Sequence, residues 1–188
     1  MLRIITGTAK GKRIETLNGE STRPTSERIK EAMFSSIQFD VENRRVLDLF
    51  AGSGQLGLEA LSRGAESVSF VDSDRAAMDV VKKNATATGF FDKCKYSVSD
   101  WRNYIRKSSD KLKFDLVFID PPYAMECSYD ALLRLVDANM LERGAIVVLE
   151  SGTEEIDFGG AKDFEIIKST HYGKKTFLNI VLFRGESE

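Results

Sequence analysis

Two patterns of hydrophobic and polar positions divide this chain near residue 40. Before that point lie two short runs with strand character, Leu2–Ile5 and Arg13–Leu17, separated by a turn over Gly7–Gly11. After it, strand-length apolar runs alternate with stretches of helical periodicity. The pattern predicts a small N-terminal hairpin in front of a larger domain of alternating strands and helices.

An amphipathic helix follows the hairpin in the sequence. Thr25 or Ser26 can cap its N-terminus, and the helical periodicity continues to about Ile37. We expect Arg28 and Lys30 to lie off its apolar face. That face consists of Ile29, Ala32, Met33 and Ile37.

The alternating region predicts five strands with four helices between them, and then a final hairpin. The expected strands are Val46–Phe50, Val68–Val71, Lys95–Val98, Phe114–Ile119 and Ala145–Glu150. The expected helices are Leu56–Arg63, Asp74–Thr86, Trp101–Lys107 and Tyr129–Asn139. The last two strands, Asp163–Ser169 and Thr176–Phe183, have no helix between them, which predicts an antiparallel hairpin.

Continuous apolar strands that are joined by helices predict a parallel sheet covered on both faces. The final hairpin makes the sheet mixed. We therefore expect an α/β fold with an extension over residues 1–40 and a domain over residues 41–188. Ligands of such sheets bind at the carboxyl ends of the strands, near the point where the strand order reverses.

Composition narrows the class of protein. The chain has 188 residues, of which 42% are hydrophobic and 30% charged, as is ordinary for one globular domain. It has no apolar run near the roughly 18 residues of a membrane span and no secretory-signal pattern. Two cysteines and one histidine argue against a disulfide scaffold and a Cys/His metal site. We expect a cytoplasmic protein without metal, in which Cys127 and His171 are structural.

The net charge of −2 is distributed unevenly along the chain. Residues 1–30 carry seven Lys or Arg and three Glu, a net charge of +4, whereas the remainder carries −6. A basic end on an acidic chain suggests an arm that binds a polyanion. A solvated lysine-rich surface explains the same charge equally well.

A glycine-rich turn follows the first strand of the larger domain. Gly52, Gly54 and Gly57 form a G-x-G-x-x-G pattern, in which backbone N–H groups can approach a ligand at a helix N-terminus. The NAD fingerprint has the same form, and a tight turn without a ligand remains an alternative. Asp48 inside the strand argues against NAD, because an acid there suits an ammonium group or an ordered water better than a pyrophosphate.

Two further acids end the next two strands. Asp72 lies 24 residues past Asp48 and can accept from both ribose hydroxyls of a nucleoside cofactor. Asp100 can accept from an adenine amine, and Trp101 either covers the ring or belongs to the core. Asp74 is expected to cap the following helix.

The sequence Asp120-Pro121-Pro122-Tyr123 ends the fourth strand and is the most specific motif. Two prolines fix the backbone direction and remove N–H donors. Asp120 and the carbonyl between the prolines can then hold the two N–H groups of a planar exocyclic amine, on whose ring Tyr123 can stack. This arrangement suits methyl transfer to an amine nitrogen of a base, and a plain turn is the alternative.

These residues resemble the class I S-adenosylmethionine-dependent methyltransferases, and more closely the bacterial small-subunit (16S) rRNA guanine-N2 methyltransferase family. The resemblance covers most of the chain. The matching stretches are Arg3–Gly7 with Lys10–Lys12, Arg23–Thr25 with Arg28 and Glu31, Leu47–Gly54, Leu56–Ala65 and Asp120–Tyr123.

The resemblance implies a Rossmann-like, seven-stranded, mostly parallel sheet with helices on both faces and an antiparallel last strand. It implies a target-base site formed by Asp120, Pro121, Pro122 and Tyr123. The expected cofactor contacts are Asp48, Phe50, Ala51, Gly52, Ser53, Gly54, Asp72, Ser73, Asp100 and Trp101. The expected RNA contacts are Arg3, Lys10, Lys12, Arg13, Arg23, Thr25 and Arg28.

The implied reaction moves a methyl group from S-adenosylmethionine to N2 of a guanine in 16S rRNA, within a ribosomal particle. The guanine would be extruded from its stack and attack the methyl group in one in-line displacement, without a metal or a covalent enzyme intermediate. We expect a monomer. The alternatives are a DNA adenine-N6 methyltransferase, a non-catalytic nucleoside- or RNA-binding module and an NAD oxidoreductase.

Overall fold

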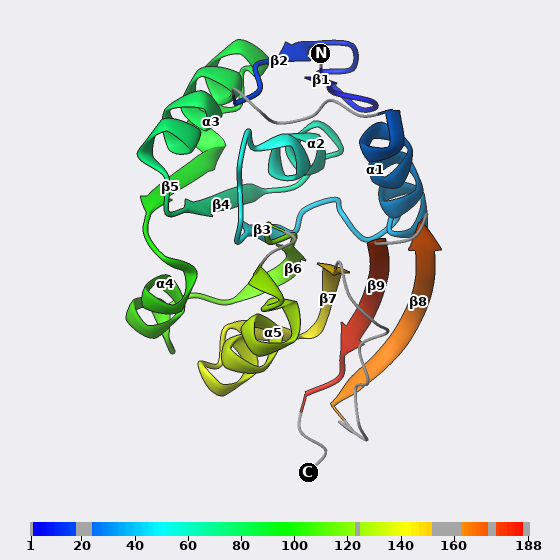
Figure 1. Cartoon of the computed structure of the whole chain (residues 1–188), viewed down its shortest axis with the longest axis vertical. Coiled ribbons are helices and arrows are strands. Elements are labelled where there is room, and N and C mark those ends of the chain that lie inside the picture. Colours follow the sequence, from blue (N-terminus) through cyan, green and yellow to red (C-terminus); the bar gives the residue numbers. More distant parts are fainter. Residues whose placement is uncertain (1, 18–23, 123–124, 152–162, 173–175, 186–188) are drawn as a thin grey trace.

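A central sheet of seven strands organises the molecule (Figure 1). The computed structural model describes residues 2–17, 24–122, 125–151, 163–172 and 176–185, without the side chains of residues 24–26. The strands are β3 (Arg45–Asp48), β4 (Ser67–Asp72), β5 (Cys94–Val98), β6 (Phe114–Ile119), β7 (Leu141–Ser151), β8 (Phe164–Tyr172) and β9 (Thr176–Phe183).

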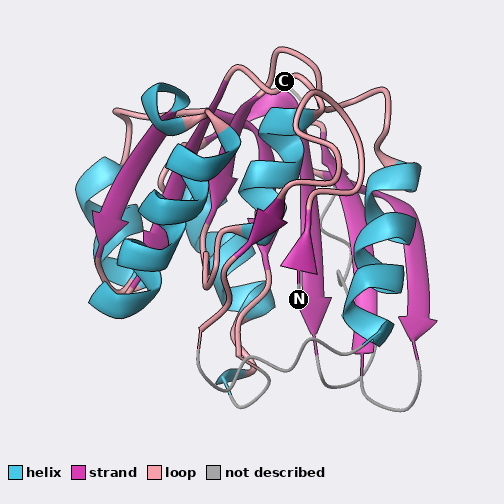
Figure 2. Ribbon diagram, turned by 90° about the horizontal axis from the view of Figure 1, so that it is seen from above, coloured by secondary structure: helices cyan, strands magenta, loops and turns pink. Residues whose placement is uncertain are grey.

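The order across the sheet is β5-β4-β3-β6-β7-β9-β8. Strands β3 to β7 are parallel, whereas β9 pairs antiparallel with both β7 and β8. The expected mixed α/β sheet with an antiparallel last strand is confirmed. Figure 2 shows that the parallel strands point toward one edge of the sheet, which we call the carboxyl edge.

Helices cover both faces of the sheet because successive strand residues alternate between two cores. Val46 and Phe118 belong to a core shared with α1–α3, whereas Leu47 and Val117 belong to one shared with α4 and α5. The helices are α1 (Pro24–Ser36), α2 (Gln55–Ser62), α3 (Arg75–Thr88), α4 (Trp101–Ser108) and α5 (Ser128–Asp137), with a short 3₁₀ turn η1 (Phe91–Lys93).

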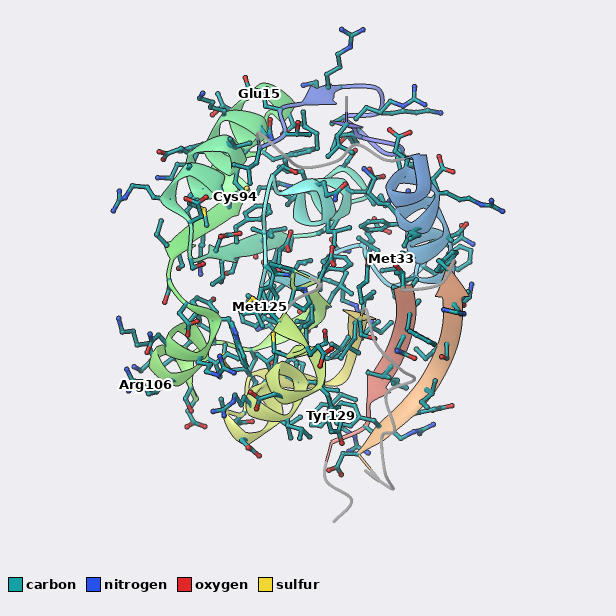
Figure 3. The ribbon with its side chains drawn as sticks, viewed as in Figure 1. Glu15, Met33, Cys94, Arg106, Met125 and Tyr129 are labelled. Carbon is teal, nitrogen blue, oxygen red and sulfur yellow. The ribbon has the colours of Figure 1, made fainter. Side chains whose placement is uncertain are left out.

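The N-terminal hairpin forms a separate two-stranded sheet of β1 (Leu2–Arg3) and β2 (Arg13–Ile14). Two elements of the larger domain anchor it. The carboxylate of Glu59 on α2 accepts from the backbone N–H groups of Ile5 and Thr6 at 2.7 and 3.0 Å. The amide of Asn84 on α3 both donates to and accepts from the backbone of Glu15. Figure 3 shows Glu15 beside α3.

The prediction that Lys30 lies off the apolar face of α1 is wrong. Lys30 is only 2% exposed. Its Nζ donates to the carbonyl of Arg3 at 3.0 Å and lies 3.9 Å from Glu59 Oε2. Burial lowers the pKa of this ammonium, although Glu59 opposes that effect. Because the hairpin and α2 supply both partners, a lysine can be buried here.

The remaining differences concern single positions. Phe34 of α1 is fully buried, whereas Ala32, which we expected on the apolar face, is half-buried. Strand β7 begins at Leu141, four residues before the expected start. In the residues that the structure describes, we find no helix with the length and hydropathy of a membrane span.

Candidate functional site

The candidate site lies at the carboxyl edge between β3 and β6. The chain passes from β3 outward to β4 and β5 and then returns to β6 on the other side of β3. This reversal is the switch point at which open α/β sheets bind ligands. The glycine-rich turn follows β3 and the Asp120-Pro121-Pro122 sequence follows β6, so the fold brings the two main motifs to adjacent strand ends.

The three glycines of the turn have different roles. Gly52 and Gly54 have positive φ angles of 52° and 79°, which favour glycine. A Cβ on Gly57 would lie 2.3 Å from the ring of Phe70, so glycine is needed there for α2 to approach β4. Behind the turn, Asn84 donates to the carbonyl of Ser53 at 2.9 Å. The turn is therefore fixed by backbone geometry and by α3.

Asp48 is buried beneath this turn and is 2% exposed. Its Oδ2 accepts from the N–H of Gly57 at 3.0 Å, at the start of α2. Burial, together with the nearby charge of Asp72, raises the pKa of this carboxyl to about 7, against the opposing effect of the Gly57 N–H. Because burial disfavours the ionised form of this carboxyl, a cationic partner such as an ammonium group would stabilise that form.

Asp72 ends β4 and also supports the turn. Its Oδ2 accepts from the N–H of Gly52 at 2.9 Å, and its Oδ1 accepts from the N–H of Asp74 at 2.8 Å. An ionised carboxylate has about four lone-pair sites, so each oxygen can still accept a ligand hydroxyl. Asp74 caps α3 by accepting from the N–H of Ala76 at 2.8 Å, which confirms its expected structural role.

Asp100 follows β5 and caps α4. Its Oδ1 accepts from the N–H groups of Arg102 and Asn103. Among the described residues Oδ2 has no partner, so this oxygen can still accept from a ligand amine. Trp101 is 3% exposed and packs in the core at 6.1 Å from the ring of Phe50. This packing is compatible with the core role, and a contact between Trp101 and the cofactor ring stays a prediction.

The acceptor side begins where β6 ends. Asp120 is half-buried, Pro121 is buried and Pro122 is exposed. The carbonyl of Pro122 accepts from the N–H of Met125 at 2.8 Å, whereas no described group donates to the carbonyl of Pro121. The carbonyl of Pro121 is the one that lies between the two prolines. Tyr123, the fourth predicted residue of this group, lies outside the described residues.

The residues predicted to contact RNA lie on the hairpin and α1. Arg3, Lys10, Arg13 and Arg28 are exposed. Lys12 is also exposed, but its Nζ donates to the carbonyls of Ala87 and Thr88 at the end of α3. Arg23 and the side chain of Thr25 lie outside the part of the chain that the structure describes.

Two polar residues that position these parts escaped prediction. Glu59 is fully buried in α2 and holds the hairpin, and Asn84 is 2% exposed and joins the hairpin to the glycine turn. An acid inside the apolar run Leu56–Leu61 was a usable signal for the first. No local pattern marks Asn84.

The chain matches the protein family described as Conserved hypothetical protein 95 over residues 2–181. It is 39% identical over 155 residues to YlbH of Bacillus subtilis, and the match covers 81% of this chain and 84% of YlbH. It is 34% identical over 155 residues to a Haemophilus influenzae protein named ribosomal RNA small subunit methyltransferase D, covering 80% of this chain and 78% of that protein.

Solved structures share the fold. The yhhF protein of Escherichia coli matches with a TM-score of 0.87 at 26% identity, covering 98% of this chain and 99% of that chain. SMU.776, solved as a complex with SAH, matches with a TM-score of 0.70 at 12% identity, covering 84% of this chain and 49% of that chain.

Proposed function

The chain belongs to the family described as Conserved hypothetical protein 95. We propose that it is an S-adenosylmethionine-dependent methyltransferase that methylates the exocyclic N2 amine of a guanine in 16S rRNA. The name of the Haemophilus influenzae relative supports small-subunit rRNA as the substrate. The position of the Asp120-Pro121-Pro122 corner beside the glycine turn is the observation that carries the proposal.

The cofactor is S-adenosylmethionine, which supplies an electrophilic methyl group on a sulfonium. The carboxylates at the ends of β3, β4 and β5 fit its polar groups. Asp72 has lone pairs for both ribose hydroxyls, and Oδ2 of Asp100 can accept from the adenine amine. Asp48 suits the ammonium group or a water bound to it. Each of these acids is already fixed by a backbone N–H of the protein.

The acceptor side has to hold a planar amine still. The carboxylate of Asp120 and the carbonyl of Pro121 provide two acceptors for the two N–H groups of the guanine amine, and Tyr123 is the expected stacking partner. Accepting both N–H groups turns the nitrogen toward the methyl group. Orientation of this kind contributes up to about 7–11 kcal/mol to a rate.

A proton must leave the nitrogen during or after the transfer. Asp120 or a water molecule accepts it. A strong base is not required because the nitrogen becomes acidic once it carries the methyl group. An ordinary carboxylate has a pKa near 4, so holding and orienting the amine is the main role of Asp120.

The proposal is tested with purified protein and S-adenosylmethionine labelled in the methyl group. Small-subunit particles and 16S rRNA from cells that lack this protein, and duplex DNA, are offered side by side. We expect label in 16S rRNA, most of it in the particle. Label only in DNA would support the adenine methyltransferase instead, and cofactor binding without transfer would support a non-catalytic module.

A further inference from the structure

Asn84 connects two segments to which the proposed function assigns different ligands. Its side chain is only 2% exposed and belongs to the second half of α3. Its Oδ1 accepts from the N–H of Glu15 at 2.8 Å. Its Nδ2 donates to the carbonyls of Glu15 and Ser53, both at 2.9 Å. Glu15 directly follows β2 of the hairpin and Ser53 lies in the glycine turn, so one amide group holds both segments.

The bonds of this amide depend on one another. An asparagine side chain has two N–H donors, and here each donor serves a different segment. If the hairpin left α3, the amide would lose two of its three bonds, and its orientation toward Ser53 would no longer be fixed. If the turn moved, a buried N–H and a buried carbonyl would lose their partner, which is costly in a site without water. Each segment therefore stabilises the position of the other.

Helix α3 supports both segments in further ways. Lys12 of the hairpin donates from its Nζ to the carbonyls of Ala87 and Thr88, at the end of this helix. In the glycine turn, a Cβ on Gly54 would lie 3.2 Å from the side chain of Val81, so the turn packs closely against α3. Strands of two residues are not stable alone. The order of the hairpin therefore depends on contacts of this kind with the larger domain.

We propose that Asn84 is a positioning residue that couples the hairpin to the cofactor-binding turn. A cofactor that fixes the turn also orders the hairpin, and an RNA held by the hairpin raises the affinity for the cofactor, because coupling between two sites is reciprocal. Such couplings typically change affinity about 5- to 150-fold. The RNA half of this inference rests on the proposed function, whereas the cofactor half requires only that the cofactor binds at the glycine turn.

A second anchor of the hairpin provides a matched control. Ser62 Oγ accepts from the N–H of Ala9 at 2.9 Å and donates to the carbonyl of Thr6 at 2.6 Å. Like Asn84, Ser62 is buried and makes two bonds to the hairpin backbone. Among the described residues its side chain has no hydrogen bond to the glycine turn. Ser62→Ala and Asn84→Ala therefore both loosen the hairpin, but only Asn84→Ala also removes the link to the turn.

The first test measures hydrogen exchange with and without saturating S-adenosylhomocysteine, which cannot donate a methyl group. The reporter is the N–H of Ile4, which donates to the carbonyl of Lys12 across the hairpin at 2.9 Å and keeps this partner in both variants. The comparator is the N–H of Asn139, which follows α5 on the face of the sheet away from the hairpin (Figure 1).

We expect the cofactor product to slow exchange at Ile4 about fivefold or more in the unaltered protein and in Ser62→Ala. In Asn84→Ala the same addition should slow it less than about twofold, because the fixed turn no longer acts on the hairpin. Exchange at Asn139 should change less than about twofold in all three proteins.

The second test measures the Kd for S-adenosylhomocysteine with and without saturating small-subunit particles from cells that lack this protein. We expect the particles to lower this Kd about tenfold in the unaltered protein and in Ser62→Ala, but only about twofold in Asn84→Ala. The remaining effect comes from direct contact between the guanine and the cofactor. A purely structural role of Asn84 would change both Kd values by the same factor and leave their ratio as it is.

Three outcomes would overturn the inference. The first is unchanged exchange at Ile4 when the unaltered protein binds the cofactor product, a result that needs no variant to fold. The second is equal slowing at Ile4 and Asn139, because the ligand then stabilises the whole protein. The third is an equal loss of coupling in both variants, which would assign it to the general stability of the hairpin. If exchange at Ile4 slowed as expected but particles were neither bound nor methylated, the coupling would stand and the proposed substrate would fail.

Discussion

The two halves of the carboxyl edge are held rigid in different ways. On the donor half, at the ends of β3, β4 and β5, each acid accepts from backbone N–H groups of the protein itself. On the acceptor half, after β6, Asp120 is followed by two prolines, which have no N–H to donate. The donor-half acids therefore combine a structural with a binding role, whereas the proline corner leaves a carbonyl available for a substrate amine.

The comparison is tested most severely by Asp120→Ala. We expect turnover to fall by about 10²–10³, the usual loss for one well-placed polar group in a transition state. Cofactor affinity should change less than about twofold because Asp120 belongs to the acceptor half. Single-turnover kinetics and calorimetry with S-adenosylmethionine measure the two quantities. Asp130→Ala on α5 is the control, and an unchanged rate for Asp120→Ala would remove its assigned role.

Asp72→Asn should show the opposite division. Replacing the carboxylate weakens charge-assisted hydrogen bonds of about 1.5–3 kcal/mol, which corresponds to a loss of about 10- to 100-fold in cofactor affinity. Turnover at saturating cofactor should fall much less. Calorimetry checks the affinity, with Asp79→Asn on the exposed side of α3 as control. An Asp72→Asn variant with normal affinity and low turnover would erase the distinction between the halves.

Asp48→Asn separates binding from stability. The pKa of Asp48 is raised in the folded protein to about 7, so its contribution to stability is present below pH 4 and is lost as the pH rises to 7. The amide does not ionise. We expect the variant to gain stability over the unaltered protein, by about 2 kcal/mol more at pH 8 than at pH 5, and to bind the cofactor less tightly.

Urea unfolding at both pH values, without cofactor, measures this difference. A stability difference that does not depend on pH would show that Asp48 is not the buried titrating acid of the donor half.

The smallest effect is expected for Asp74→Ala. This residue lies beside the donor half but caps α3, and loss of such a cap costs about 1 kcal/mol of stability. Methyl transfer should not change. Thermal unfolding and initial rates check both points. A lower cofactor affinity in this variant would extend the binding surface of the donor half beyond Asp72.

Local patterns were sufficient to predict most of the fold. Strands β4 and β6 are mostly apolar and are interrupted inside only by Ser69 and Asp115, and Asp74 and Gly89 mark the two ends of α3. The positions of Asp72 and Asp100 were predictable because each lies at the end of a predicted strand, and that of Asp48 because it lies inside the first one. In each of these cases the residues that determine the local structure lie within a few positions of one another in the sequence.

The buried polar contacts were not predictable in this way. The bond from Ile5 to Glu59 spans 54 residues of sequence, and the bond from Glu15 to Asn84 spans 69. The periodicity of α1 does not predict the burial of Lys30, because its partners come from the hairpin and from α2. The contact of Trp101 with Phe50 likewise joins two segments that are distant in the sequence.

The central claim is that the acceptor half presents a guanine N2 amine to the donor half. It is tested most directly by mass spectrometry of nucleosides from 16S rRNA, taken from cells with and without this protein and after treatment of the deficient particles with purified protein and S-adenosylmethionine. The account predicts that one N2-methylguanosine is absent from the deficient cells and is restored by the treatment. An unchanged set of methylated nucleosides, or restoration of a methyl group on another base or atom, would contradict it.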